Sequence, residues 1–168
     1  MKKYAFLDRD GALIYEPTLE DTKKRDVPYQ IDSLEKLKIL PGVLDGLKKL
    51  VEDGYKLVMI TNQNGIGTDS FPEEDFWIPQ NRMMEIFKEN GIEFEKVFIC
   101  PHFPEDNCNC RKPKIGLVDE FLKSGGIDFA NSFMSGDRDT DRQFANNIGV
   151  RFIPMTLNGD FSEVMNQI

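Results

Sequence analysis

Residues 4–11 of the chain read Tyr4-Ala5-Phe6-Leu7-Asp8-Arg9-Asp10-Gly11. The apolar part of this stretch is short and sharply bounded, which predicts a buried β-strand. Asp8 and Asp10 would then follow the carboxyl end of that strand, where ligands bind in open α/β sheets. The two carboxylates point to the same side of an extended chain, so together they can hold a hard dication through oxygen. The alternative interpretation is an acidic turn that leaves the strand at Gly11.

Outside this stretch, strand-like and helix-like segments alternate along the chain. Apolar runs at 55–60, 96–99, 132–134 and 150–153 predict further strands, and helical spacing of apolar residues predicts helices between them. Pro79 is expected to break the helical segment that contains it. The alternation predicts an α/β fold, with helices on both faces of a parallel sheet. The polar residues 12–32 are too many for an ordinary connector and are expected to form a flap over the strand ends.

Size and composition fit one globular domain. The chain has 168 residues, of which 40% are hydrophobic and 30% charged, a composition typical of folded rather than disordered proteins. Its net charge of −8 argues against a nucleic-acid partner bound through bulk charge. No apolar run reaches the length of a membrane span, and no separate signal region precedes the first strand. The expected location is therefore the cytoplasm.

Reactive side chains follow four of the predicted strands. They are Asp8 and Asp10 after the first strand, Thr61 and Asn62 after the second, Lys112 after the third and Asp137 after the fourth. Taken singly, Thr61 and Asp137 could be helix caps, and Lys112 could be a solvated lysine. As a set at one edge of a parallel sheet, they suit phosphoryl transfer. That reaction uses a nucleophile such as a carboxylate, and positive charge and donors for the phosphoryl oxygens.

The motifs along residues 8–141 resemble those of the haloacid dehalogenase-like phosphatases. They are Asp8-Arg9-Asp10-Gly11, Thr61 after an apolar strand, Lys112, and Gly136-Asp137 with Asp141 four residues later. The resemblance implies a single Rossmann-like domain over residues 1–168 with no large cap. It implies that Asp8 is the nucleophile and Asp10 the general acid/base, while Thr61 and Lys112 hold the phosphoryl oxygens. Mg²⁺ would be held by Asp8, the main-chain carbonyl of Asp10, and Asp137.

All cysteines and the single histidine of the chain lie in one short loop after the third predicted strand. Cys100, His102, Cys108 and Cys110 offer four ligands of the kind that bind Zn²⁺ tetrahedrally. With four protein ligands such a site is closed, so a structural role is expected, ordering the loop that leads to Lys112. The alternative is three incidental cysteines, an odd number that cannot pair completely in disulfides.

This loop narrows the resemblance to a branch that contains histidinol-phosphate phosphatases and heptose bisphosphate phosphatases. Stretches 30–37, 61–68 and 70–72, with Met83-Met84, look like the phosphatase portion of bifunctional histidine-biosynthesis enzymes. The implied reaction is hydrolysis of L-histidinol phosphate to L-histidinol and phosphate. D-glycero-D-manno-heptose 1,7-bisphosphate is the alternative substrate. The companion dehydratase domain is absent from the sequence, so the chain is expected to be stand-alone or part of a longer protein.

Two contacts to the small phosphorylated substrate are expected, from Asn62 and Arg111. Flap carboxylates, namely Glu16, Glu20 or Asp21, could meet its ammonium group, although each is as readily a solvated surface charge. Two other classes of protein fit part of the pattern. One is a phospho-accepting receiver domain, which needs neither a leaving-group acid nor a zinc loop. The other is a zinc-stabilised binding module without catalysis.

Overall fold

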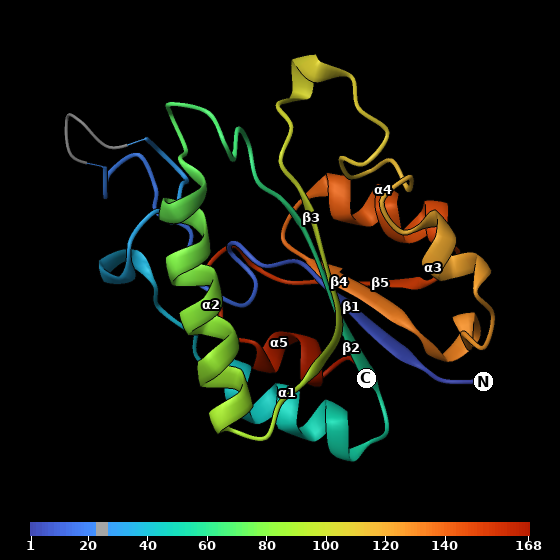
Figure 1. Cartoon of the computed structure of the whole chain (residues 1–168). Helices are drawn as coiled ribbons and strands as arrows, with labels where there is room; N and C mark the ends of the chain where they lie inside the picture. The colour runs from blue at the N-terminus through green and yellow to red at the C-terminus, as the bar shows by residue number, and fades with distance from the viewer. Residues whose placement is uncertain (23–26) are drawn as a thin grey trace.

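The computed structural model describes residues 1–22 and 27–168 (Figure 1). Five parallel strands form one sheet in the order β3-β2-β1-β4-β5. They are β1 (Tyr4–Leu7), β2 (Lys56–Asn62), β3 (Phe94–Cys100), β4 (Phe133–Gly136) and β5 (Arg151–Pro154). The predicted α/β class and parallel sheet are confirmed. Since β2 lies on one side of β1 and β4 on the other, the strand order reverses at β1, the place where such sheets bind ligands.

Helices cover both faces of the sheet, as predicted. Figure 1 shows α1, α2 and α5 on one side, and α3 and α4 on the other. Their bounds are α1 (Val43–Glu52), α2 (Glu73–Glu89), α3 (Asp119–Lys123), α4 (Asp139–Ile148) and α5 (Ser162–Met165). Short 3-10 helices are η1 (Leu34–Lys36), η2 (Pro104–Asp106) and η3 (Phe129–Asn131). Within the described ranges, no helix combines the length and the apolarity needed to cross a membrane.

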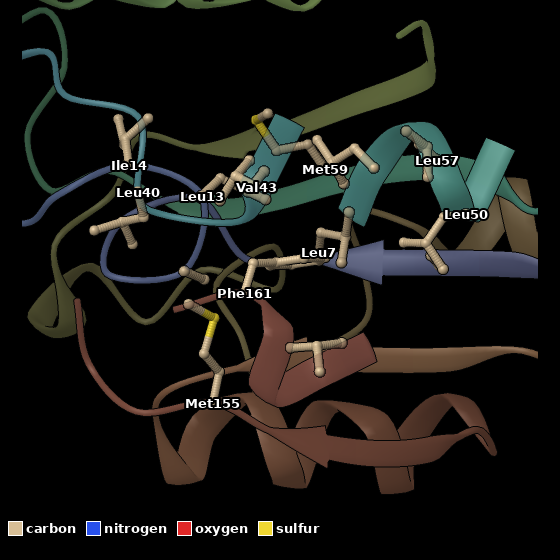
Figure 2. Close-up of a cluster of buried hydrophobic side chains, with 14 of the residues drawn as sticks. Leu7, Leu13, Ile14, Leu40, Val43, Leu50, Leu57, Met59, Met155 and Phe161 are labelled. Carbon is tan, nitrogen blue, oxygen red and sulfur yellow. The ribbon is translucent and has the colours of Figure 1, made fainter. Parts of the chain in front are cut away.

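The side chains on the two faces of β1 belong to two separate hydrophobic clusters. Leu7 belongs to the cluster that packs under α1, α2 and α5, together with Met59 of β2 and Phe161 (Figure 2). Phe6 belongs to the cluster that packs under α3 and α4. Successive residues of a strand point to opposite faces, so one short apolar run supplies both layers. Each such side chain contributes about 1.5–3 kcal/mol by its burial, which fixes β1 between the two helical layers.

The predicted break at Pro79 is wrong, because α2 runs continuously from Glu73 to Glu89 with Pro79 inside it. A proline inside a helix removes one backbone hydrogen bond and costs about 3 kcal/mol. Phe76, Met83 and Phe87 lie on the same helix face at helical spacing and are fully buried. Their burial outweighs the local cost, so tertiary packing rather than propensity decides the length of α2.

The insert between β1 and α1 contains the predicted flap. Residues 23–26, in the middle of that prediction, lie outside the described residues. In the described remainder of 8–42 the regular element is η1, so this part of the insert holds no large cap. The side chain of Asn158 pairs with the main chain of Glu16, accepting from its N–H at 2.7 Å and donating to its C=O at 3.0 Å. This contact ties the start of the insert to the loop after β5.

Candidate active site

The predicted site residues gather around one cavity of about 200 Å³ at the carboxyl edge of the sheet. Its lining includes Asp8, Asp10, Thr61, Asn62, Arg111 and Lys112. Asp137 is not part of the lining, but its carboxylate lies with that of Asp8 beside the cavity. The structure therefore brings together side chains from the carboxyl ends of four different strands or from the loops that follow them.

Lys112 is the charged centre of this arrangement. Its side chain is buried, and Nζ lies 2.7 Å from Asp8 Oδ1 and 2.7 Å from Asp141 Oδ1. Nζ also donates to the main-chain oxygen of Ile60 at 2.8 Å. Burial lowers the pKa of Lys112, but the negative charges of Asp8 and Asp141 outweigh it and leave the pKa raised. The ammonium group therefore stays charged although its side chain is buried.

Three carboxylates form a candidate metal site beside Lys112. Oxygens of Asp8, Asp137 and Asp141 all lie within 4.8 Å of one another. Among the described residues, the buried Oδ1 of Asp137 has no hydrogen-bond partner. Burial, and then the charge of Asp8, raise the pKa of Asp137 to about 7. Crowded carboxylate oxygens with an unused buried ligand atom suit a hard dication such as Mg²⁺. No metal role was predicted for Asp141, although it lies only four residues after Asp137 in the first turn of α4.

Both carboxylate oxygens of Asp10 are held by neighbouring side chains. Arg9 Nε lies 2.6 Å from Oδ1, and Gln63 Nε2 donates to Oδ2 at 2.8 Å. The same Gln63 amide nitrogen lies 2.8 Å from the Thr61 hydroxyl oxygen. Asp10 and Thr61 are thus joined through Gln63, a residue that received no role from the sequence because an amide after a strand has no distinctive spacing.

The Asn62 amide pairs with the main chain of Lys112. Its Oδ1 accepts from the Lys112 N–H at 3.0 Å, and its Nδ2 donates to the Lys112 C=O at 3.2 Å. Asn62 was expected to contact substrate, and it does line the cavity. The two hydrogen bonds also make it a clamp that joins the end of β2 to the loop after β3.

The end of β3 and the loop after it bring four cysteine and histidine side chains together. The ligand atoms of Cys100, His102, Cys108 and Cys110 all lie within 4.8 Å of one another, and the three cysteines are free thiols. Four such donors fit a closed tetrahedral Zn²⁺ site. Close to this cluster, Arg111 Nη1 donates to Asn64 Oδ1 at 2.5 Å and to the main-chain oxygen of His102 at 3.1 Å.

Of the three flap carboxylates, Glu16 reaches the cavity. It is buried and forms an ion pair with Arg138, which also lines the cavity. Burial raises the pKa of Glu16, although the Arg138 contact opposes the shift. Glu20 and Asp21 are exposed, and Asp21 accepts hydrogen bonds from the Thr18 main chain and hydroxyl at 2.8 Å. They do not line the cavity among the described residues.

A family of phosphatases matches most of the chain. The family described as polynucleotide kinase 3 phosphatase matches residues 3–156. The chain belongs to this family of haloacid dehalogenase-like phosphatases. The match confirms the phosphatase class expected from the motifs, and it covers all five strands and the residues that line the cavity.

Curated relatives of the chain, including the two described next, carry the name histidine biosynthesis bifunctional protein HisB. The protein from Legionella pneumophila (strain Lens) is 45% identical over 168 residues, covering 100% of this chain and 45% of the relative. The protein from Actinobacillus pleuropneumoniae serotype 3 is 52% identical over 146 residues, covering 87% of this chain and 38% of the relative. This phosphatase chain therefore spans less than half the length of the relatives it matches.

Solved structures of similar fold include two D,D-heptose 1,7-bisphosphate phosphatases. The enzyme from B. bronchiseptica, complexed with magnesium and phosphate, has a TM-score of 0.74 and 27% identity, covering 100% of this chain and 87% of that chain. The enzyme from Burkholderia thailandensis has a TM-score of 0.58 and 24% identity, and the match covers 99% of this chain and 86% of that chain. The haloacid dehalogenase-like fold is thereby confirmed, and the first neighbour holds the expected catalytic metal.

Proposed function

We propose that this chain is a Mg²⁺-dependent phosphomonoester hydrolase that converts L-histidinol phosphate to L-histidinol and phosphate. The observation that carries the chemistry is the meeting of Asp8, Asp10 and Lys112 at one cavity, with Lys112 Nζ 2.7 Å from Asp8 Oδ1. The assignment of the substrate is based on the relatives, which are 45–52% identical and are named for histidine biosynthesis.

In the proposed reaction, Asp8 attacks phosphorus while the bond from phosphorus to the alcohol oxygen breaks. Asp10 gives its proton to that oxygen, and L-histidinol leaves. Asp10 then takes a proton from a water molecule, which attacks the aspartyl-phosphate and releases phosphate and Asp8. Lys112 and Thr61 bind the phosphoryl oxygens through charge and hydrogen bonding.

The two proposed metal sites have different roles, one catalytic and one structural. Asp8, the main-chain carbonyl of Asp10, and Asp137 would hold Mg²⁺, which supplies positive charge for the phosphoryl oxygens. Asp141 lies close enough to join this set. The cysteine and histidine cluster would hold Zn²⁺ as a structural ion, keeping the loop that carries Arg111 and Lys112 in place.

Heptose bisphosphate is the second candidate substrate, because the structural neighbour with magnesium and phosphate is named for it. That substrate carries a second phosphate and needs additional positive charge. In the cavity Lys112 and Arg138 are already paired with carboxylates, while Arg111 donates to neutral oxygens. This distribution favours a substrate with a single phosphate and its own cationic group.

The deciding experiment measures phosphate release with Mg²⁺ from histidinol phosphate, from the heptose bisphosphate and from a 3′-phosphorylated oligonucleotide. We expect a strong preference for histidinol phosphate, and Asp8→Asn should abolish it. A preference for the heptose bisphosphate or for the oligonucleotide would overturn the substrate assignment, but the proposed mechanism would still stand. A stable aspartyl-phosphate without turnover would favour a receiver domain, and no reaction with zinc bound would favour a binding module. Unchanged rate and specificity in Arg111→Ala would remove Arg111 from the substrate contacts.

We also propose that residues 1–168 act as one phosphatase domain with a small phosphorylated substrate as its partner. Because the relatives are named bifunctional and are more than twice as long, a dehydratase segment is the proposed companion of such a domain in a longer protein. The proposed location is the cytoplasm, where thiols remain reduced and free to bind metal.

A further inference from the structure

Arg9 lies between the two catalytic aspartates in sequence, yet it is turned away from the cavity. Its side chain is 1% exposed, and it is not among the residues that line the cavity. The guanidinium carbon lies 5.0 Å from the centre of the Phe76 ring. A buried guanidinium is costly unless charge and hydrogen bonds compensate it, so its partners indicate what it holds in place.

Those partners form a chain of contacts from α2 to Asp10. Arg9 Nε lies 2.6 Å from Asp10 Oδ1, and Arg9 Nη1 donates to Gln80 Oε1 at 2.9 Å. Gln80 is 3% exposed and sits on the buried face of α2. Its Nε2 faces Met59 Sδ at 3.9 Å. Helix packing thus fixes Gln80, which in turn orients the guanidinium.

The carboxylate of Asp10 is held from its other side as well, because Gln63 Nε2 donates to Oδ2 at 2.8 Å. Contacts on both oxygens fix the plane of the carboxylate, whereas a contact on one oxygen would leave it free to rotate. Gln63 lines the cavity, but Gln80 does not. Of the two side chains that Gln80 contacts, Met59 and Arg9, it is Arg9 that reaches Asp10.

We propose that Gln80 is a positioning residue, which orients Asp10 through Arg9 for proton transfer to the leaving alcohol. The inference rests on the proposed function, in which Asp10 is the general acid. Proton transfer requires the acid within hydrogen-bond reach of the leaving oxygen, and a displacement of about 1 Å lowers rates by about 100-fold. Removing the acceptor at Gln80 frees the guanidinium to turn, and Asp10 turns with it.

The test compares two leaving groups, because only one of them needs the acid. An alkyl alcohol such as histidinol is a poor leaving group without a proton, while p-nitrophenolate leaves without one. The measured quantity is the ratio of kcat/KM for histidinol phosphate to kcat/KM for p-nitrophenyl phosphate. Gln80→Met keeps length and helix propensity but removes the acceptor for Arg9, and should lower this ratio about 10-fold or more. Gln80→Glu keeps an acceptor oxygen and should hold the ratio within about 3-fold of the wild type.

Met83→Ala is the matched control, because it disturbs the same buried face of α2 one turn later. It should change both kcat/KM values together and leave their ratio unchanged. An equal loss for both substrates in Gln80→Met, or a lowered ratio in Met83→Ala, would overturn the positioning role. If Gln80→Met does not fold, a lowered ratio in Gln80→Glu or an unchanged ratio in Gln80→Asn would overturn it equally. Should the wild type reject histidinol phosphate, the substrate assignment fails, and the ratio is measured with the alkyl phosphate that it does hydrolyse.

Discussion

Gly65 provides a sharp test of how the loop after β3 meets the loop after β2. Its backbone has φ +79°, a left-handed conformation, and an added Cβ would lie 2.3 Å from Cζ of Phe103. Phe103 belongs to the cysteine and histidine loop and lines the cavity. The Gly65 N–H also donates to the main-chain oxygen of Pro101 at 2.8 Å. Gly65→Ala should therefore push the two loops apart at the cavity wall.

The chain offers a matched control for the size of this effect. Gly91 has φ +73° with nothing within 4 Å of an added Cβ. An alanine in the left-handed region costs about 1–2 kcal/mol, less about 0.4–1 kcal/mol for the reduced entropy of the unfolded chain. Gly91→Ala should thus destabilise by about 1 kcal/mol. Gly65→Ala carries the same backbone cost plus about 1–3 kcal/mol for overpacking, and should destabilise by about 2–4 kcal/mol.

The assay is denaturant unfolding of both variants with Zn²⁺ and Mg²⁺ present, followed by kcat/KM for histidinol phosphate. Because Arg111 spans the same two loops through Asn64 and His102, Gly65→Ala should lower kcat/KM about 10-fold or more. Gly91→Ala, at the far end of α2, should leave it unchanged. Equal stabilities within about 0.5 kcal/mol, with equal kcat/KM, would refute the packing of Phe103 on Gly65.

Four further outcomes are expected. Asp8→Asn should abolish phosphate release yet keep bound zinc, measured by metal analysis, and loss of zinc would contradict two separate metal sites. Cys108→Ser should lower zinc content and kcat/KM in parallel, because the loop it anchors leads to Lys112. Leu47→Ala, at a fully buried position of α1, should cost about 2–5 kcal/mol in unfolding free energy. Burial and a hydrogen bond to Glu95 raise the pKa of Tyr4 to about 12. The neutral phenol is thus favoured in the folded state, so this contribution to stability is complete below about pH 10 and is lost as the pH rises toward 12. Tyr4→Phe should remove that part of the alkaline loss in urea unfolding, and an unchanged pH dependence would contradict the burial of the hydroxyl.

The sequence predicted the sheet and the side chains at its carboxyl edge because the signals were local and repeated. The apolar run before Asp8 and the alternation of strands and helices need no knowledge of distant contacts. The collection of Asp8, Thr61, Lys112 and Asp137 at one edge then follows from parallel strands alone. The gathering of the cysteine and histidine side chains was equally local, since all four lie within one loop.

The wrong prediction at Pro79, and the roles that were not predicted for two glutamines, depend on tertiary contacts. Pro79 was expected to break a helix, but burial of Phe76 and Met83 on one face keeps α2 continuous. Gln63 and Gln80 carried no signal, because a neutral amide becomes informative only when its partner is known. Their partners, Asp10 and Arg9, are 53 and 71 residues away in the chain.

The charge balance of the site connects its metal to its proposed substrate. Five carboxylates lie in or beside the cavity against four cationic side chains, which leaves one negative charge. The carboxylates are Asp8, Asp10, Glu16, Asp137 and Asp141, and the cations are Arg9, Arg111, Lys112 and Arg138. Burial, and then the charge of Asp8, raise the pKa of Asp137 to about 7 in this crowded group of carboxylates. One divalent cation would more than offset the single excess negative charge. An incoming phosphate then meets a site with a single net positive charge, so a substrate whose own ammonium offsets part of its phosphate charge fits better than a bisphosphate.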